Sequence, residues 1–300
     1  MKILGYIGFA IFSIFFFLYL TFPSDVLGQR LGYEIRKKTE GEVNFSFESF
    51  DLSGLNGVEA EGIDVKLGKE PPIRIDAISS HVQLWSLLTF NPALETEIEL
   101  GNGKVELEAT PQETGMELDV EIDKLDLAKP SLIAKYAGLP VRGIVKADLE
   151  TGWKSGLKTL GGQGKIKLDQ VSVGPGAIAG ISFPAISLGD IEFELTAKKG
   201  VVELKSYKQS GGNFQTRLAG KIELRSRLAS STFRDFCIQF KGDPEFLNKN
   251  SKLKSAIELA SIKLKKAPDN FMHVSFSGPM GRVRLKRGLC RKAGAKKAPR

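Results

Sequence analysis

The chain has 300 residues, of which 42% are hydrophobic and 26% are charged. This composition is that of an ordinary folded protein, and it excludes a chain that is disordered throughout. The formal net charge is +8, but residues 282–300 contain nine cations and no acid. Removing these nine leaves the rest of the chain close to neutral, so the excess charge belongs to a basic C-terminal tail.

The basic tail, residues 282–300, has no aromatic side chains interleaved with its cations. Stacking on single-stranded nucleic acid uses such aromatics, so we predict no nucleic-acid partner. Attraction to anionic lipid headgroups is physically allowed, at about 1 kcal/mol per cation near the surface. We expect a disordered end.

Cysteine and histidine are scarce, with only Cys237, Cys290, His81 and His273 in the sequence. Two cysteines cannot build a disulfide scaffold or a four-cysteine zinc site. A bridge between them is left open, and so is the redox compartment, because Cys290 lies in the basic tail. His273 falls on the polar side of an alternating run, where we expect a solvated side chain. No cluster has metal-ligand spacing, so we predict no metal, no cofactor and no catalytic residue.

Residues 3–22 contain no charged side chain. As a helix this stretch would be roughly 30 Å long, the thickness of the hydrocarbon core of a bilayer. A cleaved signal peptide is the alternative, but its apolar region should be about 7–15 residues and should end at small residues. Here Thr21, Phe22 and Pro23 follow the apolar run. We therefore predict an uncleaved transmembrane anchor over residues 1–23.

Charge gives one indication of the orientation of this anchor. Only Lys2 and the amino terminus precede the span, whereas Arg30, Arg36, Lys37 and Lys38 follow it closely. Counting lysine and arginine alone would place the body in the cytoplasm. The residues after the span, 24–41, have apolar side chains at helical spacing and end at a glycine, which predicts a juxtamembrane helix.

From residue 42 onward the apolar period falls to two, which is typical of strands with one wet face. Two runs show it best: Met116, Leu118, Val120 and Ile122 alternate with Glu117, Asp119 and Glu121, and Ile191, Phe193 and Leu195 alternate with Glu192 and Glu194. We interpret these acids as a solvated sheet face rather than as acid/base pairs, and we predict that the protein is not an enzyme.

Interruptions of the strand pattern are few. We predict a short turn at 85–88, a short helix at 130–137, and a helix opened by Asp243 and Pro244, with no long helix beyond the anchor. The glycine clusters at 161–164 and 174–176 lack the context of a phosphate-binding loop, and we interpret both as turns. No linker divides the strands, so we expect one long sheet over residues 42–281.

Four segments, 50–67, 139–168, 202–224 and 274–285, share apolar alternation, then glycine, then alternation again. They resemble the β-rich repeats of AsmA-like envelope proteins. The junction Leu-Thr-Phe-Pro-Ser-Asp-Val-Leu at 20–27 resembles the type II secretion system protein N family, whose members are also about this long. The resemblance covers essentially the whole chain, and the basic extension after Gly288 departs from it.

The resemblance implies a bacterial inner-membrane protein with one N-terminal span and a periplasmic β-rich body, associated with type II secretion subunits. It thus places the body opposite to the side that the charge count favours, and we adopt it. It carries no catalytic residues over. The larger AsmA-like relatives have a long groove linked to phospholipid transport, so phospholipid acyl chains are a second candidate partner.

Together these expectations describe a mainly β protein, with a transmembrane helix followed by an elongated, curved antiparallel sheet that forms an open groove or half-barrel. A closed sandwich core would use the same residues, and the resemblance favours the groove. The expected apolar groove lining is Met116, Leu118, Val120, Ile122, Ile191, Phe193 and Leu195.

Overall fold

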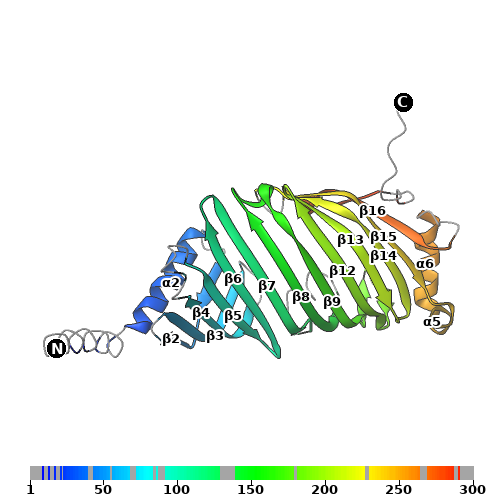
Figure 1. The fold of residues 1–300 in the computed structure, drawn as a ribbon. Coiled ribbons are helices and arrows are strands. Elements are labelled where there is room, and N and C mark those ends of the chain that lie inside the picture. Colours follow the sequence, from blue (N-terminus) through cyan, green and yellow to red (C-terminus); the bar gives the residue numbers. More distant parts are fainter. Residues whose placement is uncertain are drawn as a thin grey trace. The chain divides into compact units, whose positions relative to one another are not determined.

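The computed structural model describes residues 23–39, 43–54, 56–67, 72–83, 92–128, 139–178, 181–226, 230–263 and 269–286, together with Phe9, Ser13, Phe17, Thr21, Ser86 and Cys290. This part of the chain is mainly β, as the alternating pattern predicts (Figure 1). It divides into two compact units, residues 1–101 and residues 102–300. Each unit is built on antiparallel strands.

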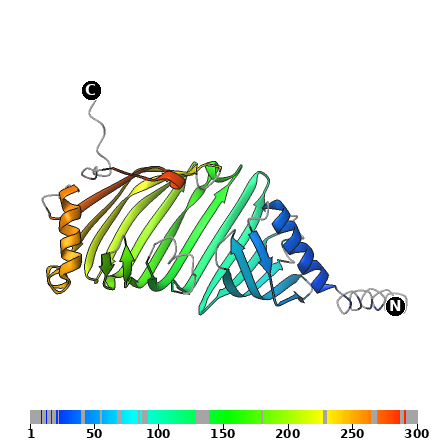
Figure 2. The same cartoon turned by 180° about the vertical axis from the view of Figure 1, so that it is seen from behind.

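Unit 1 consists of one described helix of several turns and five strands. Their bounds are Ser24–Lys38 (α2), Val43–Ser46 (β1), Ser49–Ser53 (β2), Gly57–Leu67 (β3), Ile73–Val82 (β4) and Leu94–Leu100 (β5). The long strand β3 pairs with β1 and β2 along one edge and with β4 along the other, and β4 pairs with β5. Helix α2 packs on β1 and β2 (Figure 2).

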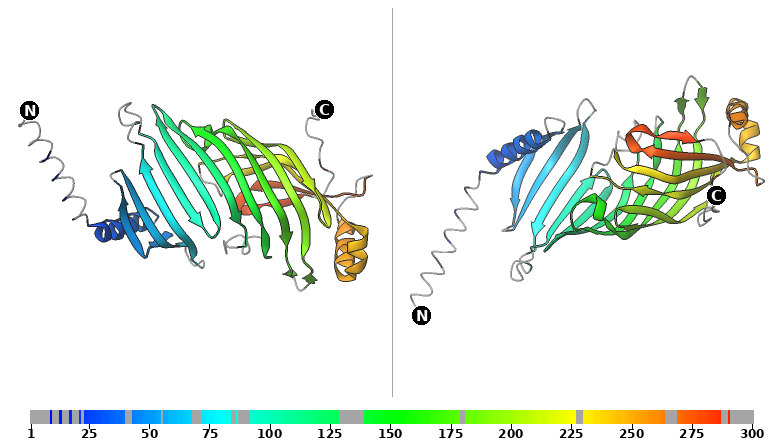
Figure 3. Two further views of the ribbon diagram at one scale, coloured as in Figure 1. Left: turned by 60° about the horizontal axis from the view of Figure 1, so that its bottom comes forward. Right: turned by 90° about the horizontal axis from the view of Figure 1, so that it is seen from above.

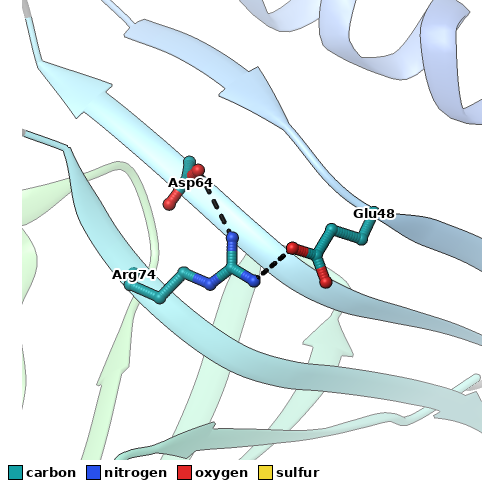
Figure 4. Close-up of polar contacts among 3 residues, drawn as sticks. All are labelled: Glu48, Asp64 and Arg74. Carbon is teal, nitrogen blue, oxygen red and sulfur yellow. Dashed lines mark hydrogen bonds and ion pairs between the residues drawn. The ribbon is translucent and has the colours of Figure 1, made fainter.

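An ion-pair cluster ties three segments of unit 1 together. Arg74 on β4 donates to Glu48, between β1 and β2, at 2.6 Å and to Asp64 on β3 at 3.4 Å (Figure 4). All three side chains are well exposed, so solvent screens both ion pairs. The cluster therefore links the three segments without adding much to stability.

Unit 2 contains the remaining described strands. Their bounds are Gly103–Gln112 (β6), Gly115–Asp126 (β7), Val141–Trp153 (β8), Gly161–Val173 (β9), Gly176–Ile178 (β10), Ile181–Phe183 (β11), Ile186–Lys198 (β12), Val201–Ser210 (β13), Phe214–Glu223 (β14), Thr232–Gly242 (β15), Met272–Pro279 (β16) and Arg284–Lys286 (β17). The main sheet has the order β6-β7-β8-β9-β12-β13-β14-β15-β16-β17, and β10 pairs with β11 in a separate two-stranded sheet. The sheet is twisted and curved, as right-handed strand twist requires (Figure 3).

The helices in the described part of unit 2 are short. They are Leu157–Thr159 (η1), Pro244–Lys249 (α5), Ser251–Lys263 (α6) and Met280–Arg282 (η3). The helix predicted at Asp243 and Pro244 is confirmed, because the carboxylate of Asp243 accepts from the backbone N–H of Phe246 at 2.9 Å and Pro244 is the first helical residue. Helix α6, which has 13 residues, was not predicted.

The interpretation of residues 161–164 as a turn is also wrong. These residues begin strand β9, which pairs with both β8 and β12. At Gly162 the backbone has φ +142°, and a Cβ atom would collide with the carbonyl oxygen of Glu150. Glycine is needed here because the neighbouring strand approaches closely, not because the chain turns. Around Pro175 the chain does bend between β9 and β10.

Several predicted segments lie largely outside the described residues. Of the expected anchor, Phe9, Ser13 and Phe17 are described and have helical backbone. No helix among the described residues is both long enough and apolar enough to cross a bilayer. The expected helix at 24–41 is present as α2, although residues 40–41 are not described. The predicted helix at 130–137 lies outside the described residues. Of the basic tail, only 282–286 and Cys290 are described. Of the predicted turn at 85–88, only Ser86 is described.

Candidate functional site

The sheet of unit 2 carries rows of apolar side chains that run across the strands. In one row Ile122 on β7 faces Ala147 on β8, Ala147 faces Ile166 on β9, and Ile166 faces Phe193 on β12. Directly opposed residues of antiparallel strands project to the same side of a sheet. Ile122 and Phe193 are two of the seven residues expected from the sequence. They lie 71 residues apart along the chain and share one face of the sheet.

A second row lies beside the first. Val120 faces Leu149, Leu149 faces Gly164, and Gly164 faces Leu195. The side chain of Leu149 occupies the space where a Cβ atom of Gly164 would stand. Glycine and leucine are thus complementary in size across β8 and β9, which keeps this row continuous.

The other three expected residues follow the same parity. Leu118 faces Thr151, Met116 faces Trp153, and Ile191 faces Leu168. All seven thus lie on one side of the unit 2 sheet, which we call the apolar face. The contributions of β8 and β9 were missed, although residues 145, 147 and 149 show the same alternation in the sequence as β7 does.

Exposure distinguishes the apolar face from a closed core. Ile191 is buried, at 8% exposure, but the other six expected residues are half-buried. A fully packed core would bury such side chains almost completely. The seven residues share a surface that keeps partial access to solvent, and their role as the lining of a groove stays a prediction.

The opposite side of the sheet is polar. Glu117, Asp119, Glu121 and Glu194 are exposed there. Lys165 on β9 donates to Glu192 on β12 at 3.1 Å, and this hydrogen bond holds the pKa of the Glu192 carboxyl below its ordinary value. Two open hollows of about 230 and 600 Å³ lie over β8, β9 and β12 and are lined mostly by acids, glycines and glutamine. These features are those of a solvated sheet face.

One polar network is embedded in the apolar face at β13 and β14. Tyr207 faces Phe193 on the neighbouring strand β12, and its hydroxyl is hydrogen-bonded to the hydroxyl of Thr216. The Gln209 side chain accepts from the backbone N–H and the hydroxyl of Thr216 and donates to the carbonyl of Phe214 at 2.7 Å. Partial burial raises the pKa of the Tyr207 phenol above its ordinary value. The network is satisfied internally, so it interrupts the apolar rows without leaving an unpaired group.

Among the described residues, one group of three potential metal ligands comes together: Cys237 on β15, His273 on β16 and Cys290, with ligand atoms within 4.8 Å of one another. Cys237 and Cys290 are joined in a disulfide. Metal binding requires the thiolate forms, so a metal could be held only after reduction. Sequence spacing could not find this group because its members lie 36 and 17 residues apart.

His273 is buried, at 6% exposure, and the expectation of a solvated side chain is wrong. The alternation was right in placing it on the face opposite Met272 and Val274. That face, however, is covered here by the C-terminal segment: the backbone N–H of Cys290 donates to Nδ1 of His273 at 2.9 Å. Nδ1 is therefore an acceptor, and the ring hydrogen is on Nε2, which has no hydrogen-bond partner among the residues that the structure describes.

No family model, curated protein or solved structure matches this chain significantly.

Proposed function

We propose that this protein is a non-enzymatic accessory component of the type II secretion system, anchored in the bacterial inner membrane with its sheet in the periplasm. The family proposal rests on the residues quoted above, chiefly the junction at 20–27. In this role the anchor confines the protein to the membrane, and the sheet contacts other secretion subunits or lipid.

The apolar face is the observation that carries a contact function. Its rows extend over β7, β8, β9 and β12, and their side chains remain half-buried. Apolar surface that is left accessible beside a fully polar opposite face favours association with another apolar surface. The acids of the opposite face are solvated and dispersed, which suits a protein that binds rather than one that catalyses.

The disulfide between Cys237 and Cys290 supports the periplasmic placement. Structural disulfides persist in oxidising compartments and are rare where glutathione and thioredoxin keep thiols reduced. The disulfide therefore agrees with the family resemblance and opposes the lysine and arginine count around residues 24–38.

A lipid-binding or lipid-transfer module is the second candidate. It is favoured by the composition of the apolar face, where aliphatic side chains such as Val120, Leu149 and Ile166 form continuous rows suited to acyl chains. In this case the apolar face would hold phospholipid acyl chains rather than a protein partner.

Native extraction and mass spectrometry separate the two candidates. The full chain is purified in mild detergent and its bound lipids are quantified. Stoichiometric phospholipid that is lost in Leu195→Asp but kept in the matched polar-face variant Glu194→Gln would establish the lipid module. The accessory component would be established by two results together. The native chain would carry no stoichiometric lipid, and secretion subunits would co-purify with it but not with Leu195→Asp.

Topology is tested independently by reporter fusion after Gly41. An alkaline phosphatase joined there should be active, because the enzyme folds only outside the cytoplasm. An inactive phosphatase, with an active cytoplasmic reporter at the same position, would overturn the periplasmic placement.

A further inference from the structure

Helix α2 is fixed to the sheet of unit 1 by its glycines. Gly28 is buried, and a Cβ atom there would collide with the ring of Phe47 and lie 3.1 Å from Cβ of Phe50. One turn later, a Cβ atom on Gly32 would lie 3.4 Å from the carbonyl oxygen of Phe45. Residues four apart lie on one side of a helix, so this glycine side is the packed side of α2.

The other side of α2 exposes large apolar side chains. The exposed fractions are 63% for Val26, 39% for Leu27, 47% for Leu31 and 62% for Tyr33. Elsewhere in the described part of unit 1 after residue 23, only Leu94 is a comparably exposed large apolar residue. Apolar exposure concentrated on one short helix marks a contact surface rather than ordinary surface composition.

Cations accompany these apolar side chains. Arg30, Arg36, Lys37 and Lys38 are all exposed, against two acids in the helix sequence. At about 100° per residue, Val26, Arg30, Tyr33 and Lys37 follow one another along one line of the helix, and Leu27, Leu31 and Lys38 follow an adjacent line. Apolar side chains thus dominate the first half of the exposed side, and cations dominate its end.

The pattern is that of an interfacial helix, in which apolar side chains enter the boundary between headgroups and acyl chains while cations contact anionic headgroups. The position of α2 agrees, because the helix begins two residues after the uncharged stretch at 3–22 ends. A chain whose stretch spans the bilayer must keep α2 within reach of the membrane surface.

We propose that the exposed side of α2 binds the surface of an anionic phospholipid bilayer and thereby holds unit 1 against the membrane. The inference rests on the anchoring proposed above. The glycine side packs on β1 and β2, and the opposite side, centred on Val26, Arg30 and Tyr33, lies in the headgroup region, with Leu27 and Leu31 on its flank. Arg36, Lys37 and Lys38 supply the attraction to anionic headgroups.

The test places a nitroxide spin label on the full chain in nanodiscs of phosphatidylcholine with phosphatidylglycerol. Val26→Cys and Leu31→Cys carry the label in turn, and Glu99→Cys, exposed on β5, is the matched control. Because the native cysteines are paired, the label reports on the introduced site. At 26 and 31 we expect collisions with oxygen to exceed those with a water-soluble nickel complex, and at 99 the reverse.

A charge variant tests the electrostatic part. In Lys37→Gln with Lys38→Gln, each cation removed should lower the ratio of docked to undocked helix roughly fivefold. Lys66→Gln, exposed on β3, should change nothing. Labels at 26 and 31 that stay water-accessible in floating nanodiscs would overturn this inference and leave the anchoring intact.

Two other results are distinguishable. Full chain that fails to float with the nanodiscs would overturn the anchoring and this inference with it. Labels that are already shielded in detergent, with spin–spin broadening between chains, would mean that a second copy covers α2, and would overturn the lipid assignment.

Discussion

Cys237, in the middle of β15, is joined to Cys290, which lies 53 residues later and beyond the last strand of the sheet, with 5.9 Å between the two Cα atoms. Strand β17 pairs with β16 over only three residues. The disulfide therefore ties Cys290 covalently to β15, in addition to the short ladder between β16 and β17.

The disulfide predicts a stability difference. Cys290→Ser should lower the free energy of unfolding by about 4 kcal/mol, the loop-entropy value for a closed loop of this length. Urea unfolding of the full chain in detergent, with and without reductant, measures it. Reductant should destabilise the native chain to the level of Cys290→Ser and leave the variant unchanged. Equal stability of all forms would show that the disulfide does not constrain the chain.

Phe193→Asp distinguishes an accessible apolar face from a closed core. Because Phe193 is half-buried, the new carboxylate can reach water, so we expect the variant to keep a cooperative melt. Its free energy of unfolding should fall by less than about 3 kcal/mol, the value for fully burying a phenylalanine ring. Circular dichroism follows the melt, and lipid or partner binding should be lost. Disappearance of the cooperative transition would indicate a closed core instead.

Glu192→Leu is the matched control on the opposite side of β12. It removes the ion pair with Lys165, which is screened by solvent and contributes little to stability. Its melt should stay close to that of the native chain. Damage equal to that of Phe193→Asp would contradict the assignment of the two faces.

The period of two was sufficient to predict most of the strands and the parity of the seven site residues. The pleat fixes which side each residue takes, and parity follows from the sequence without knowledge of strand order. The register that sets Ile122, Ala147, Ile166 and Phe193 in one row could not be predicted, because it depends on loop lengths and bulges that shift the pairing between strands.

The errors have a common cause, which is contact between segments distant in sequence. Sequence alone indicates a turn at Gly162 because glycine usually marks turns, whereas in the fold the close approach of β8 requires this glycine. Alternation predicts the correct face for His273 but not its burial, because nothing near it in sequence indicates that Cys290 contacts it. Local patterns predict which side a residue takes, and tertiary contacts decide what lies on that side.

Gly162→Ala should destabilise the sheet by about 1–3 kcal/mol, because the residue has φ +142° and its Cβ atom would collide with the backbone of β8. Gly161→Ala is the matched control. A Cβ atom at Gly161 would have the carbonyl oxygen of Ala197, at 3.9 Å, as its nearest contact, which is an ordinary van der Waals distance. Urea unfolding compares the two. Equal stability of both variants would contradict the close approach of β8 and β9.

Arg217 on β14 provides a prediction of pH dependence. Its guanidinium donates to Asp269 at 2.7 Å and lies 3.9 Å over the ring of Phe271, which is buried. The hydrogen bond from Arg217 holds the pKa of the Asp269 carboxyl below its ordinary value of 3.8. A carboxyl whose pKa is lower in the folded state stabilises that state above its unfolded pKa, and this stabilisation is lost as pH falls through the folded pKa.

Arg217→Met keeps the aliphatic cover on Phe271 and removes the charge. The pKa of Asp269, followed by the carboxyl carbon chemical shift in an NMR titration, should rise toward its ordinary value, because the hydrogen bond from Arg217 is the largest cause of the depression. Stability of the native chain should exceed that of the variant at neutral pH, and the difference should shrink as pH falls below about 4, where the unfolded carboxyl is protonated. Arg217→Lys should retain part of the pKa depression. Because the pair is exposed, added salt should also weaken the depression of the Asp269 pKa. An Asp269 pKa that is identical in the native chain and in Arg217→Met would contradict the pairing of these two residues.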